Sequence, residues 1–149
     1  MTNARTWRLR DVAAAVQMQP RALRQCFEIG ALKLSGEDVR SSGSGHFVRL
    51  SKPRAYQAGT MKQLHRLGLS IPHAARMAFT FSDEGNIGRK PGELFDHGMT
   101  ILSVDQNGAT VKNLFSFSEA TGACVAFVRM NEIVDQVNIA LDNISKKAT

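Results

Sequence analysis

The sequence has little cysteine and few aromatic residues, and it contains no long hydrophobic run. Its two cysteines, Cys26 and Cys124, belong to no CxxC or Cys/His ligand spacing, so neither a disulfide framework nor a zinc site is expected. No apolar run approaches the roughly 20 residues that span a bilayer. Residues 1–10 also lack the apolar segment of a secretory signal. We therefore expect a cytoplasmic protein with no metal, no cofactor and no membrane partner.

Catalytic motifs are missing from the sequence as well. It contains no paired carboxylates, no nucleophile with a neighbouring base and no metal-ligand spacing. The glycine-rich stretch Gly85-Asn-Ile-Gly88 lacks the preceding strand and following helix of a dinucleotide site. We therefore predict no catalytic residues and expect the protein not to be an enzyme.

The charge of the chain is divided unevenly between its two halves. The net charge is +6 over 149 residues, but residues 1–80 carry 13 Lys/Arg against 4 Asp/Glu, a net of +9. Residues 81–149 carry 6 against 9, a net of −3. A basic surface can simply be solvated, yet its concentration in one half favours a polyanionic partner for that half.

Two short helices are predicted within this basic half. Apolar residues recur at helical spacing over Leu9–Val16, which predicts a first helix. Pro20 suits the first turn of a second helix, which we predict from Pro20 to about Glu28. Gly30 can adopt the left-handed conformation that ends it. The spacing predicts a helix-turn-helix.

The second of these helices carries the best candidates for reading DNA. Arg21, Arg24 and Gln25 lie within about one turn of one another, and Gln19 precedes them. Long donor-bearing side chains of this kind contact base edges and phosphates. Leu23 lies on the opposite face of the helix and is predicted to face the core.

The next segment changes from helical to strand patterning. Residues 34–50 contain two short apolar stretches around a Ser/Gly-rich tip, which predicts two strands in the manner of the wing of a winged helix. The alternative is a disordered polar loop. A wing would place Arg40 and Arg49 along a phosphate strand, with His46 as a further candidate and Arg54 beside it.

Helical spacing returns over Lys52–Leu67, and Ser70 is a predicted cap for a fourth helix that continues toward Phe79.

Three motifs in the first half of the chain carry a family resemblance. In order they are Pro20-Arg-Ala-Leu-Arg24, Phe27-Glu-Ile-Gly-Ala-Leu-Lys33 and Leu64-His-Arg-Leu-Gly-Leu-Ser-Ile71. With them, Leu9–Met77 resembles the DNA-binding domain of the MerR family. The resemblance implies a winged helix-turn-helix and a dimer that binds two half-sites of double-stranded DNA.

The second half of the chain resembles no family that we can name. Residues 81–95 have the composition of a linker or loop. Strands are predicted over Met99–Val104, Ala109–Phe117 and Ala123–Val128, with a hairpin turn at Asn107-Gly108. We thus predict an α+β fold with a DNA-binding domain at 1–80, a linker or loop at 81–95, and a small antiparallel sheet with a carboxy-terminal helix at 96–149.

The predicted carboxy-terminal helix begins at Asn131 and has one apolar stripe. It can cover the small sheet, or it can pair with the same stripe of a second chain. We take the second possibility as the predicted homodimer contact and the 96–149 region as a dimerisation or protein-docking unit. The predicted dimer residues are Ile133, Val137, Leu141 and Ile144.

Together these patterns favour a nucleoid-associated, sequence-specific DNA-binding regulator of transcription, with RNA polymerase or another DNA-bound protein as a further partner. The alternative is an architectural DNA-binding factor of the excisionase type, a recombination directionality factor of a mobile element. Such a factor would bend DNA and recruit an integrase, so the neighbouring genes would distinguish the two. The carboxy-terminal half could also be a ligand sensor, but its few aromatic residues argue against a deep pocket.

Overall fold

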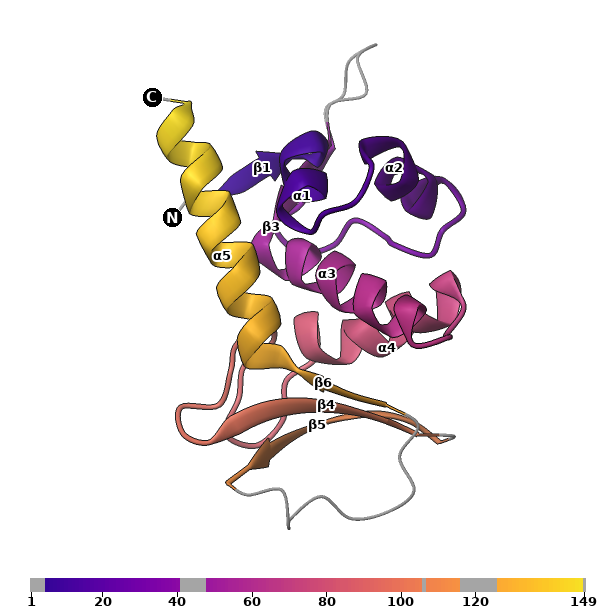
Figure 1. Cartoon of the computed structure of the whole chain (residues 1–149), viewed down its shortest axis with the longest axis vertical. Coiled ribbons are helices and arrows are strands. Elements are labelled where there is room, and N and C mark those ends of the chain that lie inside the picture. The colour runs from indigo at the N-terminus through magenta and orange to yellow at the C-terminus, as the bar shows by residue number, and fades with distance from the viewer. Residues whose placement is uncertain (1–4, 41–47, 106, 116–125, 149) are drawn as a thin grey trace.

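The computed structural model of the chain is an α+β fold, as the sequence predicts, and it describes residues 5–40, 48–105, 107–115 and 126–148 (Figure 1). These residues form five helices and two three-stranded antiparallel sheets. The helices are α1 Leu9–Ala15, α2 Pro20–Glu28, α3 Lys52–Arg66, α4 Ile71–Ser82 and α5 Met130–Lys147. The strands are β1 Thr6–Arg8, β2 Val39–Arg40, β3 Val48–Ser51, β4 Met99–Asp105, β5 Gly108–Leu114 and β6 Ala126–Arg129.

The amino-terminal elements follow the predicted order, with one strand that the sequence did not predict. Helix α2 begins at Pro20, and Gly30 has a φ of +77° just beyond its end, the left-handed conformation that glycine adopts without strain. Strand β1 pairs with β3, which also pairs with β2, so the sheet order is β1-β3-β2. Residues 41–47, the predicted tip with His46, lie outside the described residues.

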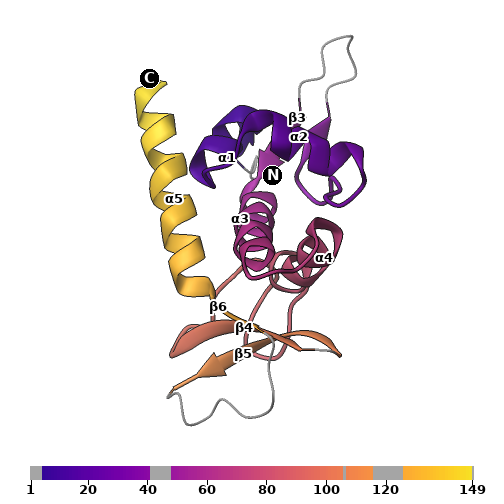
Figure 2. The same ribbon diagram turned by 45° about the vertical axis from the view of Figure 1, so that its right-hand side comes forward.

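Helices α3 and α4 form an antiparallel pair joined by a tight turn. Pro53 occupies the first turn of α3, and Gly68 has a φ of +108° after its last residue. The Ser70 side chain then accepts a hydrogen bond from the backbone N–H of His73, which caps α4 as predicted. Because the turn is short, α4 packs back along α3, and the pair forms the centre of the molecule (Figure 2).

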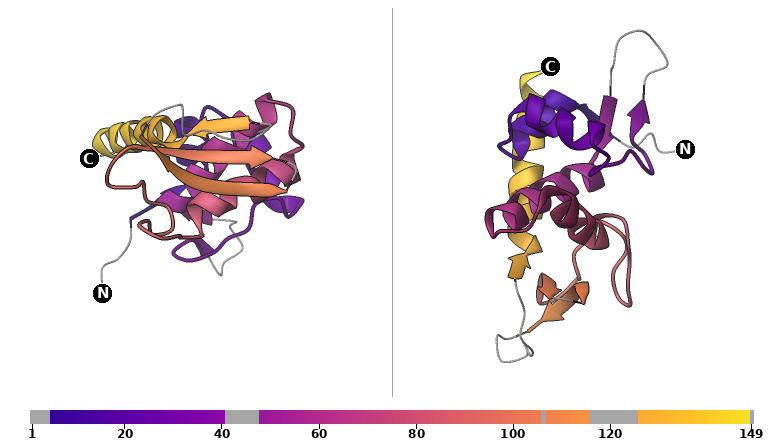
Figure 3. Two further views of the ribbon diagram at one scale, coloured as in Figure 1. Left: turned by 90° about the horizontal axis from the view of Figure 1, so that it is seen from below. Right: turned by 90° about the vertical axis from the view of Figure 1, so that its right-hand side faces the viewer.

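The carboxy-terminal sheet has β4 between β5 and β6, which is visible from below in Figure 3. The hairpin of β4 and β5 closes at the pair Asp105 and Gly108, at the predicted Asn-Gly turn. One face of the sheet lies against α3, α4 and α5. The side chains Leu102, Val104, Val111, Ala126 and Val128 thereby join the main hydrophobic core.

The apolar stripe of α5 packs within its own chain, which corrects the predicted dimer contact. Ile133, Val137 and Leu141 are buried, and Ile144 packs against the same core. Gly59 on α3 lies against this stripe: a Cβ at that position would be in van der Waals contact with Ile133 at 3.4 Å and with Val137 at 3.6 Å. Periodicity identified the apolar face of α5 but not the surfaces that α5 packs against, which are α1, α3 and β4 of the small sheet.

The hydrophobic core is continuous through both predicted domains. The Trp7 indole donates to Ser145 Oγ at 3.1 Å, and the Tyr56 hydroxyl donates to Asn138 Oδ1 at 2.8 Å. Both bonds join the amino-terminal half to α5. The predicted boundary near residue 80 therefore does not coincide with a break in the core.

Residues 83–95 form a loop organised around the buried side chain of Arg89. Its guanidinium donates to the backbone carbonyls of five residues and lies 5.0 Å from the centre of the Phe81 ring. These bonds satisfy a charged group that is 7 % exposed. The segment predicted from its glycine-rich composition as a linker or loop is therefore a loop ordered by the contacts of Arg89, and not a free linker.

Among the described residues, no helix combines the length and the apolar character needed to cross a membrane.

Candidate nucleic-acid interface

Helix α2 has one buried face and one exposed face. Leu23 and Cys26 are buried against the core, with exposed fractions of 0 % and 5 %. Burial raises the pKa of the Cys26 thiol against the opposing effect of a backbone hydrogen bond, so this side chain stays a neutral part of the core at neutral pH. The helix is held on the body by these residues, and its other face points to solvent.

The exposed face of α2 brings together four of the predicted site residues. Gln19, Arg21, Arg24 and Gln25 are all exposed and line one surface depression, together with Pro20 and with Glu28 at the far end of the helix. Within the described part of the chain, none of the four side chains forms a hydrogen bond or an ion pair. Their donors therefore remain able to bind an external acceptor.

Strands β2 and β3 carry two more predicted contacts, Arg40 and Arg49. Both side chains are exposed. Arg49 donates through Nε to Thr6 Oγ1 at 2.9 Å and through Nη2 to the Thr6 carbonyl at 2.7 Å, which ties β3 to β1. In Figure 1 these strands and α2 lie at the same end of the molecule, opposite the β4–β6 sheet. His46 lies outside the described residues.

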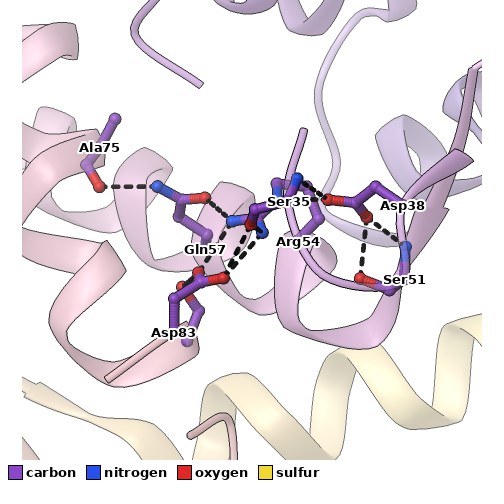
Figure 4. Close-up of polar contacts among 8 residues, drawn as sticks. Ser35, Asp38, Ser51, Arg54, Gln57, Ala75 and Asp83 are labelled. Atoms are coloured by element: carbon purple, nitrogen blue, oxygen red, sulfur yellow. Dashed lines mark hydrogen bonds and ion pairs between the residues drawn. The ribbon is translucent and has the colours of Figure 1, made fainter. Parts of the chain in front are cut away.

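Arg54 is not at the surface, and its prediction as a phosphate contact is wrong. Its side chain is 1 % exposed and forms ion pairs with Asp38 at 2.9 Å and with Asp83 at 2.8 Å. The physical reason is its place in the first turn of α3, where the side chain extends between the loop before β2 and the end of α4 (Figure 4). All of its charge is compensated inside the protein, so it cannot face DNA.

The Arg54 network joins three separate segments of the chain. Arg54 also donates to Gln57, whose amide in turn donates to the Ala75 carbonyl at 2.9 Å. Asp38 accepts from the Ser51 backbone N–H at 2.7 Å and from the Ser51 hydroxyl at 2.8 Å. Figure 4 shows how these bonds link the base of the β2–β3 pair to α3 and α4. The network therefore fixes the strands that carry Arg40 and Arg49 relative to the body.

The carboxyl of Asp83 is strongly influenced by this network. Burial alone would raise the pKa of Asp83, but hydrogen bonds from Arg54, Ser82 and Ser35 and the charge of Arg54 lower it below its usual value. Burial of the Arg54 guanidinium would lower its pKa, but the hydrogen bonds and the charges of Asp83 and Asp38 raise this pKa above its usual value. Arg54 and Asp83 are therefore both ionised at neutral pH.

We expect acid to weaken the fold through Asp83. An unfolded aspartate has a pKa of about 3.9, and the pKa of Asp83 in the folded protein is lower. The unfolded chain therefore binds the proton first as the pH falls, and the stabilisation present above about pH 4 is lost as the pH approaches the folded pKa. Urea unfolding between pH 7 and pH 2.5 measures this loss. The Asp83→Asn variant is the control, and an equally steep pH dependence in that variant would contradict the assignment.

Sequence reasoning missed the two carboxylates that hold Arg54. Asp38 and Asp83 lie 16 and 29 residues from Arg54 along the chain. No local pattern joins residues at such separations, because the pairing of β2 with β3 places Asp38 beside Arg54 and the packing of α4 on α3 places Asp83 there. The strand Thr6–Arg8 was missed because three residues are too few to establish an alternating pattern.

Compared with protein-family models and with the sequences of curated proteins, the chain matches none. The resemblance to the MerR family therefore rests on the three short motifs given above.

Proposed function

We propose that this protein is a sequence-specific, double-stranded DNA-binding regulator of transcription that inserts α2 into the major groove. The observation that carries the proposal is the solvent-facing side of α2, where Gln19, Arg21, Arg24 and Gln25 gather without partners among the described residues. The opposite side of the helix is anchored through Leu23 and Cys26. An anchored helix with a donor-rich outer face is the arrangement that reads base edges.

The side chains of this face suit particular base edges. The guanidinium of arginine donates two parallel hydrogen bonds to O6 and N7 of guanine, and the amide of glutamine pairs with N6 and N7 of adenine. Arg24 and Gln25 carry these groups from the middle of α2, while Gln19 and Arg21 lie at its beginning. Recognition helices contact base edges through their amino-terminal part, and three of the four residues lie within the first five positions of α2 or directly before them.

Phosphate contacts would come from the strands beside α2. Arg40 on β2 and Arg49 on β3 are exposed at the same end of the molecule as α2. In this proposal they act as a wing that fixes the orientation of α2 on the duplex, as in the winged helix-turn-helix of the MerR family. The net charge of +9 over residues 1–80 provides the general attraction to the polyanion.

We expect the salt dependence of DNA binding to report the contact made by Arg40. Each phosphate contact contributes about −0.9 to the slope of log K against log salt concentration. Arg40→Ala should reduce the magnitude of this slope by about 1, as measured by fluorescence anisotropy with a labelled duplex. Arg129→Ala is the matched control, because Arg129 is an exposed arginine on β6 at the opposite end. Equal slopes for the wild type and Arg40→Ala would remove Arg40 from the interface.

The resemblance to the MerR family also implies that two chains bind an inverted repeat. The stripe of Ile133, Val137 and Leu141 is occupied within its own chain, so a dimer must use another surface. In the proposal, the two copies of α2 then read half-sites about one helical turn apart, roughly 34–36 Å.

A further inference from the structure

A groove runs along the side of the molecule, away from the exposed face of α2. It lies between the end of α1, α3 and α5 and has a volume of about 530 Å³. A second hollow of about 400 Å³ adjoins it between α3, β6 and the start of α5. The two share Gln63, Arg66, Ile133 and Gln136. Figure 2 shows α5 beside α1 and α3, the three helices that form the groove.

The groove exists because its floor is made of small residues. Ala14 and Ala15 at the end of α1, Gly59 on α3 and Ala140 on α5 line it. Larger side chains at these positions would fill the space between the helices. Ala14 is exposed within it, so the floor is accessible from solvent.

The rim of the groove combines carboxamides with positive charge. Gln17, Gln63, Gln136 and Asn143 supply carboxamides, and Lys62 and Arg66 supply cations. Lys62 Nζ donates to the backbone carbonyls of Val16 and Gln17 at 3.2 and 2.7 Å. Its charge therefore faces the groove in a fixed position.

The carboxylates near the groove do not cancel this positive charge. The residues that line the first hollow include no aspartate or glutamate. The second hollow includes Glu132, which is paired with Arg129 at 2.9 Å. Arg66 is exposed and has no partner among the described residues, so its guanidinium is able to bind an anion from outside.

Three large apolar side chains are exposed along the same groove. Ile139 is 62 % exposed, Leu67 60 % and Phe127 44 %. Ile139 lines the first hollow, and Leu67 and Phe127 line the second. Apolar side chains gathered beside a groove are typical of protein-binding surfaces.

We propose that this groove binds an extended, acidic peptide segment of another protein that also carries apolar side chains. Its carboxylates would pair with Arg66 and with the charge of Lys62. The carboxamides of Gln63, Gln136 and Asn143 both donate and accept hydrogen bonds, as a peptide backbone requires. The apolar side chains of the segment would pack on Ile139, Leu67 and Phe127.

A nucleic acid suits the groove less well than such a peptide. Its sugar–phosphate backbone carries no amide N–H to donate to the carboxamides of the rim, and it has no apolar side chains to pack on Ile139, Leu67 and Phe127. The groove includes no residue of α2. The groove and the proposed DNA-reading face therefore share no lining residue.

The test is a selection of peptides on the intact protein without DNA. A random 12-residue library displayed on phage is selected on the wild type, and the enriched peptides are synthesised with a fluorescent label for anisotropy titrations. We expect enrichment of Asp, Glu and large apolar residues. Arg66→Glu should weaken binding by at least about tenfold, because a like charge replaces an opposite one. Ala14→Trp should also weaken it, because the indole fills the floor of the groove.

The matched control is Arg76→Glu, which makes the same charge change at an exposed arginine of α4 outside the groove. It should leave peptide affinity within about twofold, and thermal unfolding checks that each variant is folded. Four results would overturn the proposal. The first two are a selection that enriches no peptide and a selection that enriches basic peptides. The third is an equal loss of peptide affinity in Arg66→Glu and Arg76→Glu. The fourth is displacement of the bound peptide by a second copy of the chain or by random-sequence DNA.

Discussion

Replacing Arg54 with methionine is expected to lower the free energy of unfolding by about 3–5 kcal/mol, because it leaves two buried carboxylates without their counter-charge. The Asp38 side chain is fully buried and that of Asp83 is 15 % exposed. Methionine matches the length of the arginine stem, so the loss comes from charge and hydrogen bonds more than from packing. Urea unfolding at pH 7 measures the change.

A double-mutant cycle separates the ion pair from the rest of the Arg54 network. Removing the charge of Asp83 as well, in Arg54→Met with Asp83→Asn, should restore part of the stability, because one uncompensated carboxylate is then absent. Arg24→Ala is the control at an exposed position and should change the free energy of unfolding by no more than about 0.5 kcal/mol. A loss below about 1 kcal/mol in Arg54→Met would contradict the role given to this network.

Arg24→Ala is expected to have its effect on DNA binding instead. If Arg24 donates two hydrogen bonds to a guanine, its removal should weaken binding to the specific site by about 1–3 kcal/mol and relax the base preference at one position. The fold should be unaffected, because Arg24 is exposed and forms no contact with a partner within the described residues.

Mobility-shift titrations with the specific site and with substituted sites measure this effect. The control is Arg129→Ala, at the end of the molecule opposite α2. Unchanged affinity and unchanged base preference in Arg24→Ala would remove this residue from DNA recognition. A uniform loss over all sequences would instead assign it to a phosphate.

The elements of the amino-terminal half other than β1 could be predicted because local signals define them. Pro20 at the start of α2 and Gly30 after its end are backbone constraints that act within a few residues. The exposed face of α2 follows from the same periodicity, since Leu23 marks the buried side. Such signals need no knowledge of the rest of the fold.

The partners of the predicted surfaces could not be read in the same way. The pattern of Ile133, Val137 and Leu141 defines an apolar stripe, but only the packed chain identifies α1, α3 and β4 as the elements that α5 packs against. The sequence predicts Arg54 as a phosphate contact because it lies beside the predicted wing, and charged residues are mostly exposed. Its burial depends on Asp38 and Asp83, which the fold brings together from distant parts of the sequence.

The most direct test of the proposed function is selection of bound duplexes from a random DNA pool by the intact protein, followed by sizing of the complex. We expect enrichment of one sequence, arranged as an inverted repeat and bound by two chains, and loss of that enrichment when Arg21 and Arg24 are both replaced by alanine. Failure of the wild type to enrich any sequence would contradict it, as would unchanged enrichment by the double variant.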